Sequence, residues 1–376
     1  LLIEILTLYM ILPRKINFTQ MARYGKHGEQ TYRQNFNRKK KDCIDWLLLN
    51  LSLARRVLDM DGLLAIAIDP CYISKAGKKT PHIGRFWSGC AGAVKHGLEI
   101  MGVGLLDVAN NKCMMLRAHQ TIGNSALKMR NKTLVEYYIS VMKRYSKKLL
   151  SITDIVVADA FFSTSTFEKG MSELGFYLVS RFRDNACLHY IPKREKGRGR
   201  PRVKGDKIDL ANLNLSCMEE LHIDGLDGKA YTLEAYAKAL KKRVRLVIWR
   251  MPGGKCKLFF STKLSMTGEE VLKTYRTRFQ IEFCYRDSKQ FTGLMDCQAR
   301  HKSQLDFAFN ASFASLNAAK VFMKDNGMDN SMAKVKSLMF NANYTKLIFD
   351  MSRCRPNRTL ISKIVKELIG WQPKAA

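Results

Sequence analysis

The feature that most constrains this chain of 376 residues is the spacing of four polar residues between positions 275 and 289. Tyr275, Arg278, Glu282 and Lys289 stand at offsets of 0, 3, 7 and 14. Because a helix turns by about 100° per residue, one continuous helix would place their side chains within an arc of roughly 60°. This helix face could hold a metal ion on Glu282 and grip phosphate oxygens beside it. The alternative is an exposed helix in which Arg278 and Glu282 form an ordinary i,i+4 pair.

Two upstream aspartates stand at the ends of short apolar runs. Asp69 follows Leu-Leu-Ala-Ile-Ala-Ile and precedes Pro70, whereas Asp159 follows Ile-Val-Val-Ala. Such runs are typical of buried strands, and ligands collect where buried strands end in α/β folds. Each aspartate could instead simply terminate a strand or start a turn. We interpret Asp69, Asp159 and Glu282, which follow one another on strand, strand and helix, as metal-ligating carboxylates.

The spacing Tyr-x2-Arg-x3-Glu-x6-Lys resembles the YREK signature of bacterial insertion-sequence DDE transposases of the insertion-sequence 4 family. The segments AIDPCYISKAGKKT, VVADAFFS and GRGRPRVKG are also similar to these transposases, and the resemblance covers roughly residues 60–320. It implies that Asp69, Asp159 and Glu282 form the catalytic Asp-Asp-Glu triad of an RNase H-like fold. Tyr275, Arg278 and Lys289 would then contact DNA.

The resemblance also implies cut-and-paste transposition, in which DNA is hydrolysed at the element ends and then joined to a target by strand transfer. The three carboxylates would hold two Mg²⁺ ions, for which Mn²⁺ can substitute. The partners would be terminal inverted repeats and target DNA, bound by a homodimer. Cleavage in this family often forms a DNA hairpin with a flipped base, which needs an aromatic stack. Trp249 is the candidate DNA-binding residue for that stack, although we favour the alternative of a buried strand residue.

The charge of the chain agrees with a nucleic-acid partner. Lys and Arg number 64 against 33 Asp and Glu, which gives a net charge of +31. Such an excess is typical of proteins that bind polyanions. Basic runs at residues 38–41, 193–202 and 241–243 are far apart in the sequence. We therefore expect them to contact the DNA backbone at separate points without reading its sequence.

The sequence indicates neither secretion nor membrane insertion. The apolar opening, Leu1 to Leu12, is too short to cross a bilayer and contains Glu4. The ten cysteines include no CxxC pair and no zinc-like spacing, and we interpret Cys71 and Cys284 as small buried residues. We expect a bacterial cytoplasmic protein that associates with the nucleoid on DNA. The chain does not begin with methionine, so we expect its native N-terminus to be missing.

The order of expected elements divides the chain into five regions. From Leu63 to Phe182 we expect the order strand, strand, strand, helix, strand, helix, strand. Periodicity alone identifies this order only as mixed α/β. The separation of 123 positions between Asp159 and Glu282 is too long for a simple crossover. The regions are a helical N-terminal DNA-binding region (1–58), the two parts of an α/β RNase H-like core (59–182 and 267–325), a mostly β insertion (183–266) and a helical C-terminal region (326–376).

Two other functions remain open from the sequence. One is a domesticated DNA-binding protein that keeps the fold without cleaving DNA, and the other is a stand-alone RNase H-like nuclease. An intact set of three carboxylates argues against the first, because binding DNA phosphates does not require carboxylates. Strand-transfer activity on transposon ends would separate a transposase from the second.

Overall fold

A computed structural model describes the chain except residues 14, 38–43, 193–201, 329–330, 353–355 and 371–376. The strands are β1 (Leu64–Ser74), β2 (Gly84–Ser88), β3 (Ala93–Asp107), β4 (Lys112–Gln120), β5 (Ile155–Val157), β6 (Tyr177–Arg181), β7 (Leu188–Tyr190), β8 (Glu219–Leu221), β9 (Lys229–Ala237), β10 (Lys242–Arg250) and β11 (Cys256–Ser261). The α-helices are α1 (Leu2–Ile11), α2 (Phe18–Tyr24), α3 (Glu29–Phe36), α4 (Trp46–Val57), α5 (Asn124–Met129), α6 (Leu134–Leu150), α7 (Ser165–Glu173), α8 (Gly268–Thr277), α9 (Gln280–Phe291), α10 (Lys302–Asp325), α11 (Met332–Met351) and α12 (Arg358–Gly370). These elements form a mixed α/β fold.

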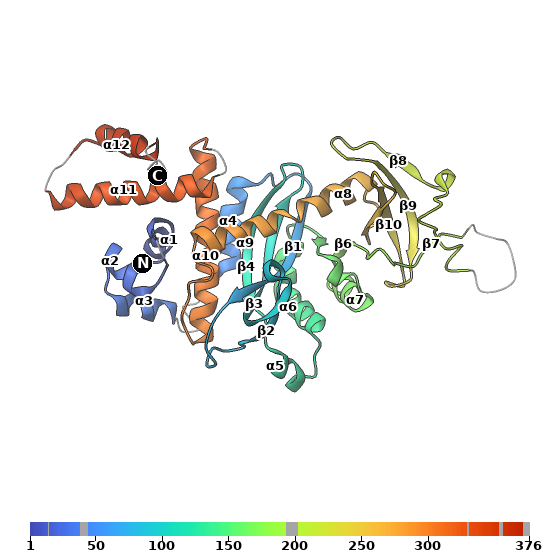
Figure 1. The fold of residues 1–376 in the computed structure, drawn as a ribbon, viewed down its shortest axis with the longest axis horizontal. Coiled ribbons are helices and arrows are strands. Elements are labelled where there is room, and N and C mark those ends of the chain that lie inside the picture. The colour runs from blue at the N-terminus through green and yellow to red at the C-terminus, as the bar shows by residue number, and fades with distance from the viewer. Residues whose placement is uncertain (14, 38–43, 193–201, 329–330, 353–355, 371–376) are drawn as a thin grey trace.

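The described strands form a single mixed sheet. Their order is β2-β3-β1-β5-β6-β11-β10-β9-β7, with β4 beside β3 and β8 beside β9. Figure 1 shows the sheet occupying the middle and right of an elongated molecule, with α1–α3, α11 and α12 at the left. The expected strands and helices from Leu63 to Phe182 are confirmed in their order, with the added short strand β2 and helix α5.

The first half of the sheet is built around β1. β3 runs antiparallel to β1 over its full length, from Leu64↔Asp107 to Ser74↔Gly97, whereas β5 and β6 run parallel to it. The residues of β1 alternate between two buried cores, as the period of a strand requires. Ile66 packs with α4, α6 and α7 on one face, and Ala67 packs with α8, α9 and α10 on the other.

The free edge of β4 is covered by asparagines from α10, a helix that spans the core. The Asn310 side chain accepts a hydrogen bond from the Ala118 N–H (2.8 Å) and donates one to the Ala118 carbonyl (3.1 Å). Two turns later, Asn317 exchanges the same pair of bonds with Met115, at 3.2 and 2.7 Å. Both asparagines are fully buried. They satisfy backbone groups that a neighbouring strand would otherwise satisfy, so the sheet ends here without an unpaired buried edge.

The second half of the sheet contains β7–β11. β9, β10 and β11 pair antiparallel and lie within the region expected to be mostly β. β11 also pairs with β6, through Phe259↔Arg181 and Ser261↔Val179. The two halves therefore share one continuous sheet.

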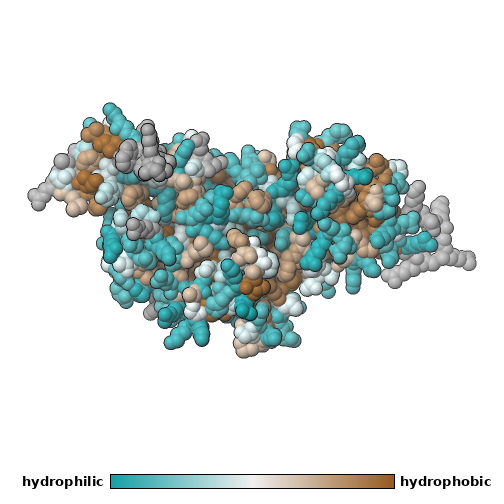
Figure 2. Space-filling view, viewed as in Figure 1, coloured by the Kyte–Doolittle hydropathy of each residue, from teal (hydrophilic) through white to brown (hydrophobic). Residues whose placement is uncertain are grey.

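The helical ends of the chain pack on α10. Asn17 caps α2, since its side chain accepts a hydrogen bond from the Gln20 N–H (2.8 Å), and Gly25 and Gly28 lie between α2 and α3. α1 and α3 share a buried cluster with the residues of α10 around Phe307. Figure 2 shows hydrophilic residues over most of the visible face, with hydrophobic ones gathered at the α11–α12 and β8–β10 ends. No helix in the described part of the chain is long and apolar enough to cross a bilayer.

Candidate active site

Strand register brings Asp69 and Asp159 together. The last residues that β1 and β5 pair are Ala67↔Val157, and each aspartate follows two positions later on parallel chains. The expectation that Asp69 ends its strand is wrong, because β1 continues to Ser74 alongside β3. What ends near Asp69 is the pairing with β5, which opens a gap on that side of the strand. Asp159 does follow its strand, and its Oδ1 accepts a hydrogen bond from the Phe161 N–H (3.0 Å).

Glu282 reaches the same place from α9 through Arg278. Nη2 of Arg278 lies 2.8 Å from a Glu282 carboxylate oxygen, and Nη1 lies 3.7 Å from one of Asp69. The guanidinium is largely buried, with 12% of the side chain exposed. Asp69 and Glu282 therefore share one cation between the sheet and the helix.

The single continuous helix expected from Tyr275 to Lys289 is divided in the structure. α8 ends at Thr277 and α9 begins at Gln280, and the Phe279 and Glu282 N–H groups bond three residues back, as in a 3₁₀ turn. α8 packs on β6, β10 and β11, whereas α9 packs on β1 and β4. Because adjacent strands rotate by about 20–25°, a straight helix cannot lie flat on both halves of the sheet.

The negative charges of the site act on one another. Burial raises the pKa of Asp69 to about 7, and the charges of Asp159, Glu282 and Glu99 add to the rise, while Arg278 opposes it. These charges act on Asp69 from nearby, since charge effects fall off with distance. The site thus holds more negative charge than its arginine neutralises.

Three residues that support this site were not found from the sequence. The Tyr285 hydroxyl on α9 donates to the backbone carbonyl of Asp69 (2.5 Å), which fixes the helix against β1. Gly102 lies opposite Asp69 on β3, and a Cβ there would meet the Tyr285 hydroxyl at 2.1 Å. Glu99 is buried and accepts a hydrogen bond from Tyr138 (2.5 Å). Only Glu99 left a signal in the sequence, because it is a single glutamate inside the mostly apolar segment that forms β3.

Tyr275 lies beside the site, as its motif position suggests. The Arg278 guanidinium lies 5.6 Å from the centre of the Tyr275 ring. Burial raises the pKa of Tyr275, the charge of Asp159 adds to the rise, and Arg278 opposes it. The phenol therefore belongs to the same group of charges as the carboxylates.

Lys289 lies one step further along the sheet. Burial raises the pKa of Cys71 to about 11, and the charge of Lys289 together with its hydrogen bond opposes the rise. Lys289 thus contacts Cys71, two positions beyond Asp69 on β1. Cys71 and Cys284 are buried, as expected.

Trp249 lies on β10, at the edge of the same group. Its ring is stacked with Phe259 (6.5 Å between centres), and Phe259 in turn contacts Tyr275 (5.0 Å). The indole N–H donates to the Asp227 carbonyl (2.6 Å), and the Lys257 ammonium lies 4.9 Å from the ring centre. The side chain is half-buried, so it is neither a fully enclosed core residue nor a free platform.

A cavity of about 540 Å³ opens beside Asp159. Phe161, Phe182, Arg183, Asn185 and Lys238 contribute to its lining. Phe161 is 42% exposed there. Aromatic and cationic groups thus line a cavity at the turn that follows Asp159.

The basic runs are only partly visible. Residues 38–41 and 193–201 lie outside the described residues. In the third run Lys242 pairs with the buried Glu168 (2.5 Å), so this lysine has a structural partner, while Lys241 and Arg243 are exposed.

The carboxylates suit a hard cation by their chemistry, since Mg²⁺ and Mn²⁺ prefer oxygen ligands. Their combined negative charge also favours a bound cation. As the side chains stand, however, no three His, Cys, Asp or Glu residues in the described ranges are grouped to hold a metal ion. Arg278 lies between Asp69 and Glu282, and it must move for both carboxylates to share an ion.

Comparison with known families agrees with this geometry. Residues 1–245 match the family model described as DDE superfamily endonuclease. This chain belongs to that family. The match includes Asp69 and Asp159 and ends before Glu282. A search of proteins of curated function found no match. Membership makes this DDE endonuclease a nuclease by class, with DNA as the substrate and divalent metal ions as the typical cofactors of the superfamily.

Proposed function

We propose that this DDE endonuclease is a transposase of the insertion-sequence 4 type, which cuts an insertion sequence from DNA and joins it to a target. The observation that carries the proposal is that Arg278 pairs with both Asp69 and Glu282, while the negative charge of Asp159 acts on Asp69. Residues that are 90 and 123 positions apart reach one place because of the strand register and the α8–α9 turn. Simple DNA binding would be weakened by such a concentration of carboxylates beside phosphates.

The strand order supports an RNase H-like core. β4, β3, β1, β5 and β6 lie side by side, with the first three antiparallel and the last two parallel to β1. That order and those directions are the ones the RNase H fold uses. We assign residues 59–182 and 267–325 to this core, 183–266 to a mostly β insertion, 1–58 to a DNA-binding region and 326–376 to a C-terminal helical region.

The site residues would divide the work of phosphodiester cleavage. Asp69, Asp159 and Glu282 would hold two Mg²⁺ or Mn²⁺ ions, which supply charge stabilisation to the attacking and leaving oxygens. Arg278 donates a hydrogen bond to Glu282 and forms an ion pair with Asp69 at 3.7 Å, and its buried Nε has no hydrogen-bond partner among the described residues. An unpaired buried donor is costly, so a DNA phosphate oxygen is a suitable partner for it.

The remaining residues of the Tyr-Arg-Glu-Lys motif would position the DNA. Lys289, beyond Cys71 on the same sheet face, would contact a phosphate further along the strand. Tyr275 would donate to a phosphate next to Arg278. Trp249, joined to Tyr275 through Phe259, would stack on an unpaired base if cleavage forms a hairpin. A homodimer on paired inverted repeats would bring two ends together.

The test uses DNA that carries the inverted repeats flanking the gene. With Mg²⁺, the purified protein should cut at the repeat ends and join the cut ends to a target plasmid. Binding without cleavage would support the domesticated DNA-binding protein instead. Cleavage of unrelated branched or nicked DNA, without joining, would support the stand-alone nuclease.

A further inference from the structure

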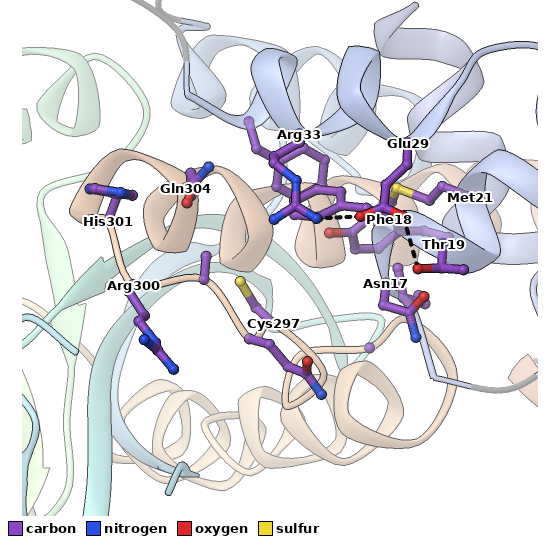
Figure 3. Close-up of a pocket in the computed structure, with 16 residues that line it drawn as sticks. Asn17, Phe18, Thr19, Met21, Glu29, Arg33, Cys297, Arg300, His301 and Gln304 are labelled. Carbon is purple, nitrogen blue, oxygen red and sulfur yellow. Dashed lines mark hydrogen bonds and ion pairs between the residues drawn. The ribbon is translucent and has the colours of Figure 1, made fainter. Parts of the chain in front are cut away.

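A second cavity, here called the α10 cavity, lies between the N-terminal helices and the start of α10. It has a volume of about 550 Å³ and is lined by α2, α3 and residues of the 293–304 segment. Figure 3 shows Arg33 and Gln304 facing this space from α3 and α10, with the Cys297 sulfur across from them and Arg300 extending from the rim. None of the residues assigned above to DNA cleavage lines it.

The start of α10 gives the cavity an electropositive wall. α10 is a helix of 24 residues, and no side chain caps its first turn. Its N-terminal N–H groups and dipole therefore favour a negative charge nearby. Gln304 in that turn is only 8% exposed, and its side chain forms no hydrogen bond with any described residue. Its amide therefore has hydrogen-bonding capacity left for a polar ligand in the cavity.

Cations surround this wall. Arg33 pairs with Glu29, which also accepts a hydrogen bond from Thr19 (3.1 Å), and the Arg33 guanidinium is held 5.1 Å from the Phe18 ring centre. Of these cations, Glu29 neutralises only Arg33. Arg300 has no acidic partner among the described residues.

A further lysine adjoins the same rim. The Lys75 ammonium donates to the Cys297 carbonyl (2.6 Å). Burial lowers the pKa of Lys75, and the charge of Arg300 adds to this effect. Both cations on this rim therefore favour a bound anion.

The floor of the cavity is apolar. Ile16, Phe18, Met21 and Phe36 contribute to it, and the Phe18 and Phe36 rings meet edge to face with 4.9 Å between centres. A phosphate alone does not need such a floor, but a nucleoside does. The volume lies within the range of about 300–1,000 Å³ that is usual for small-molecule sites.

Strand β1 connects the carboxylates with the rim of the α10 cavity. β1 leads from Asp69 to Ser74 and on to Lys75, six residues that span about 20 Å in extended chain. A DNA strand advances about 3.4 Å per nucleotide along its axis, so this span corresponds to about six nucleotides. Lys289, beside Cys71, lies on the same path.

We propose that the α10 cavity binds one nucleotide, with its phosphate at the α10 N-terminus, Gln304 and Arg300, and its base over the floor of Phe18 and Phe36. The nucleotide is either an unpaired one at the end of a DNA strand or a free nucleotide. The first source rests on the proposed function, and the second does not.

The experiment uses the full chain carrying Asp159→Asn, which should bind DNA without cutting it. One probe is deoxyadenosine 5′-monophosphate, measured by calorimetry. The other is a duplex with a three-nucleotide single-stranded tail containing 5-iododeoxyuridine, measured by anisotropy against a blunt duplex and by photocrosslinking. Binding of the free nucleotide assigns the cavity to a free ligand. Preference for the tailed duplex alone assigns it to a DNA end.

Cavity variants decide whether the proposal stands. Gln304→Leu and Arg300→Gln should each weaken binding of the responding probe about tenfold, since each removes a hydrogen bond to a charged group. Arg23→Gln is the matched control, because Arg23 is exposed on α2 outside the cavity and should leave binding unchanged. Gln304→Glu keeps the side-chain size and adds a negative charge, so it should weaken binding further. Crosslinks should fall within residues 16–36 or 297–304.

Several results would overturn the proposal: no binding of either probe, equal effects of the cavity variants and Arg23→Gln, or crosslinks confined to other segments. Arg300 is exposed, so its substitution tests the idea even if Gln304→Leu fails to fold. Cleavage by the wild-type protein is measured in parallel. Nucleotide binding without any cleavage would overturn the proposed function and leave the cavity assignment standing, and cleavage without cavity binding would do the reverse.

Discussion

The two halves of the sheet differ in what they present to a substrate. The first half, β1–β6, is covered by helices on both faces and brings carboxylates to the point where β1 and β5 separate. The second half, β7–β11, offers Trp249, which carries Lys257 over its ring and is joined to Tyr275 through Phe259. Rigid, doubly covered strands suit groups that must be placed accurately, whereas the more exposed half suits contacts along a flexible polymer. The comparison predicts that chemistry depends on the first half and DNA handling on the second.

The largest effect is expected from Asp159→Asn in the first half. Cleavage should fall by about a thousandfold or more, which corresponds to roughly 4 kcal/mol in the barrier, because a charged metal ligand is lost. Asparagine can still accept the Phe161 N–H bond, so the fold should be preserved. Gel assays of cleavage and binding check this. The control is Glu234→Gln on β9, which removes an equal charge from the second half and should leave cleavage unchanged. Retained cleavage in Asp159→Asn would show that the chemistry does not depend on the first half of the sheet.

The next effect concerns stability. Asn317→Leu should lower the free energy of unfolding by about 2–4 kcal/mol, because the Met115 N–H and carbonyl lose their buried partner. Thr232→Val in the second half removes one bond to the Leu246 carbonyl (3.0 Å) and should cost only about 1 kcal/mol. Urea denaturation measures both. Equal losses would show that the first half is no more tightly specified than the second.

Trp249→Ala should act on a late step. If Trp249 stacks on an expelled base, its loss should slow hairpin formation by about 5- to 100-fold, which corresponds to about 1–3 kcal/mol. The first nick should be spared, because nicking depends on the carboxylates. Stepwise kinetics and melting temperature are measured together. A loss of stability of about 3–5 kcal/mol, with all steps depressed alike, would instead assign Trp249 to the core.

The smallest effect is expected from Lys289→Ala. Losing one phosphate contact should weaken binding alike on all DNA sequences and reduce the salt dependence of binding by about one unit. Lys273→Ala on α8 is the control, because Lys273 is exposed and pairs with Glu269 (2.5 Å). Titrations at several salt concentrations give the slope. A loss confined to particular sequences would mean that Lys289 reads a base.

Much of the architecture could be predicted from local pattern. Short apolar, β-branched runs predicted the strands that lead to Asp69 and Asp159. Each of these depends on neighbours within a few residues, which the sequence records directly. The pattern could not give the bounds of β1, because the continuation past Pro70 depends on pairing with β3, far along the chain.

The sequence by itself determined which chemical groups we propose this protein brings to DNA: three acidic residues in chain order, a basic excess and the Tyr-Arg-Glu-Lys spacing. Tertiary structure decided how they meet. The Ala67↔Val157 register placed Asp69 beside Asp159, and sheet twist divided the expected helix at Arg278. The Tyr285 bond to Asp69, which needs Gly102 opposite it, links three segments that show no relation in sequence. Such contacts depend on packing between distant elements, and short-range periodicity carries no record of them.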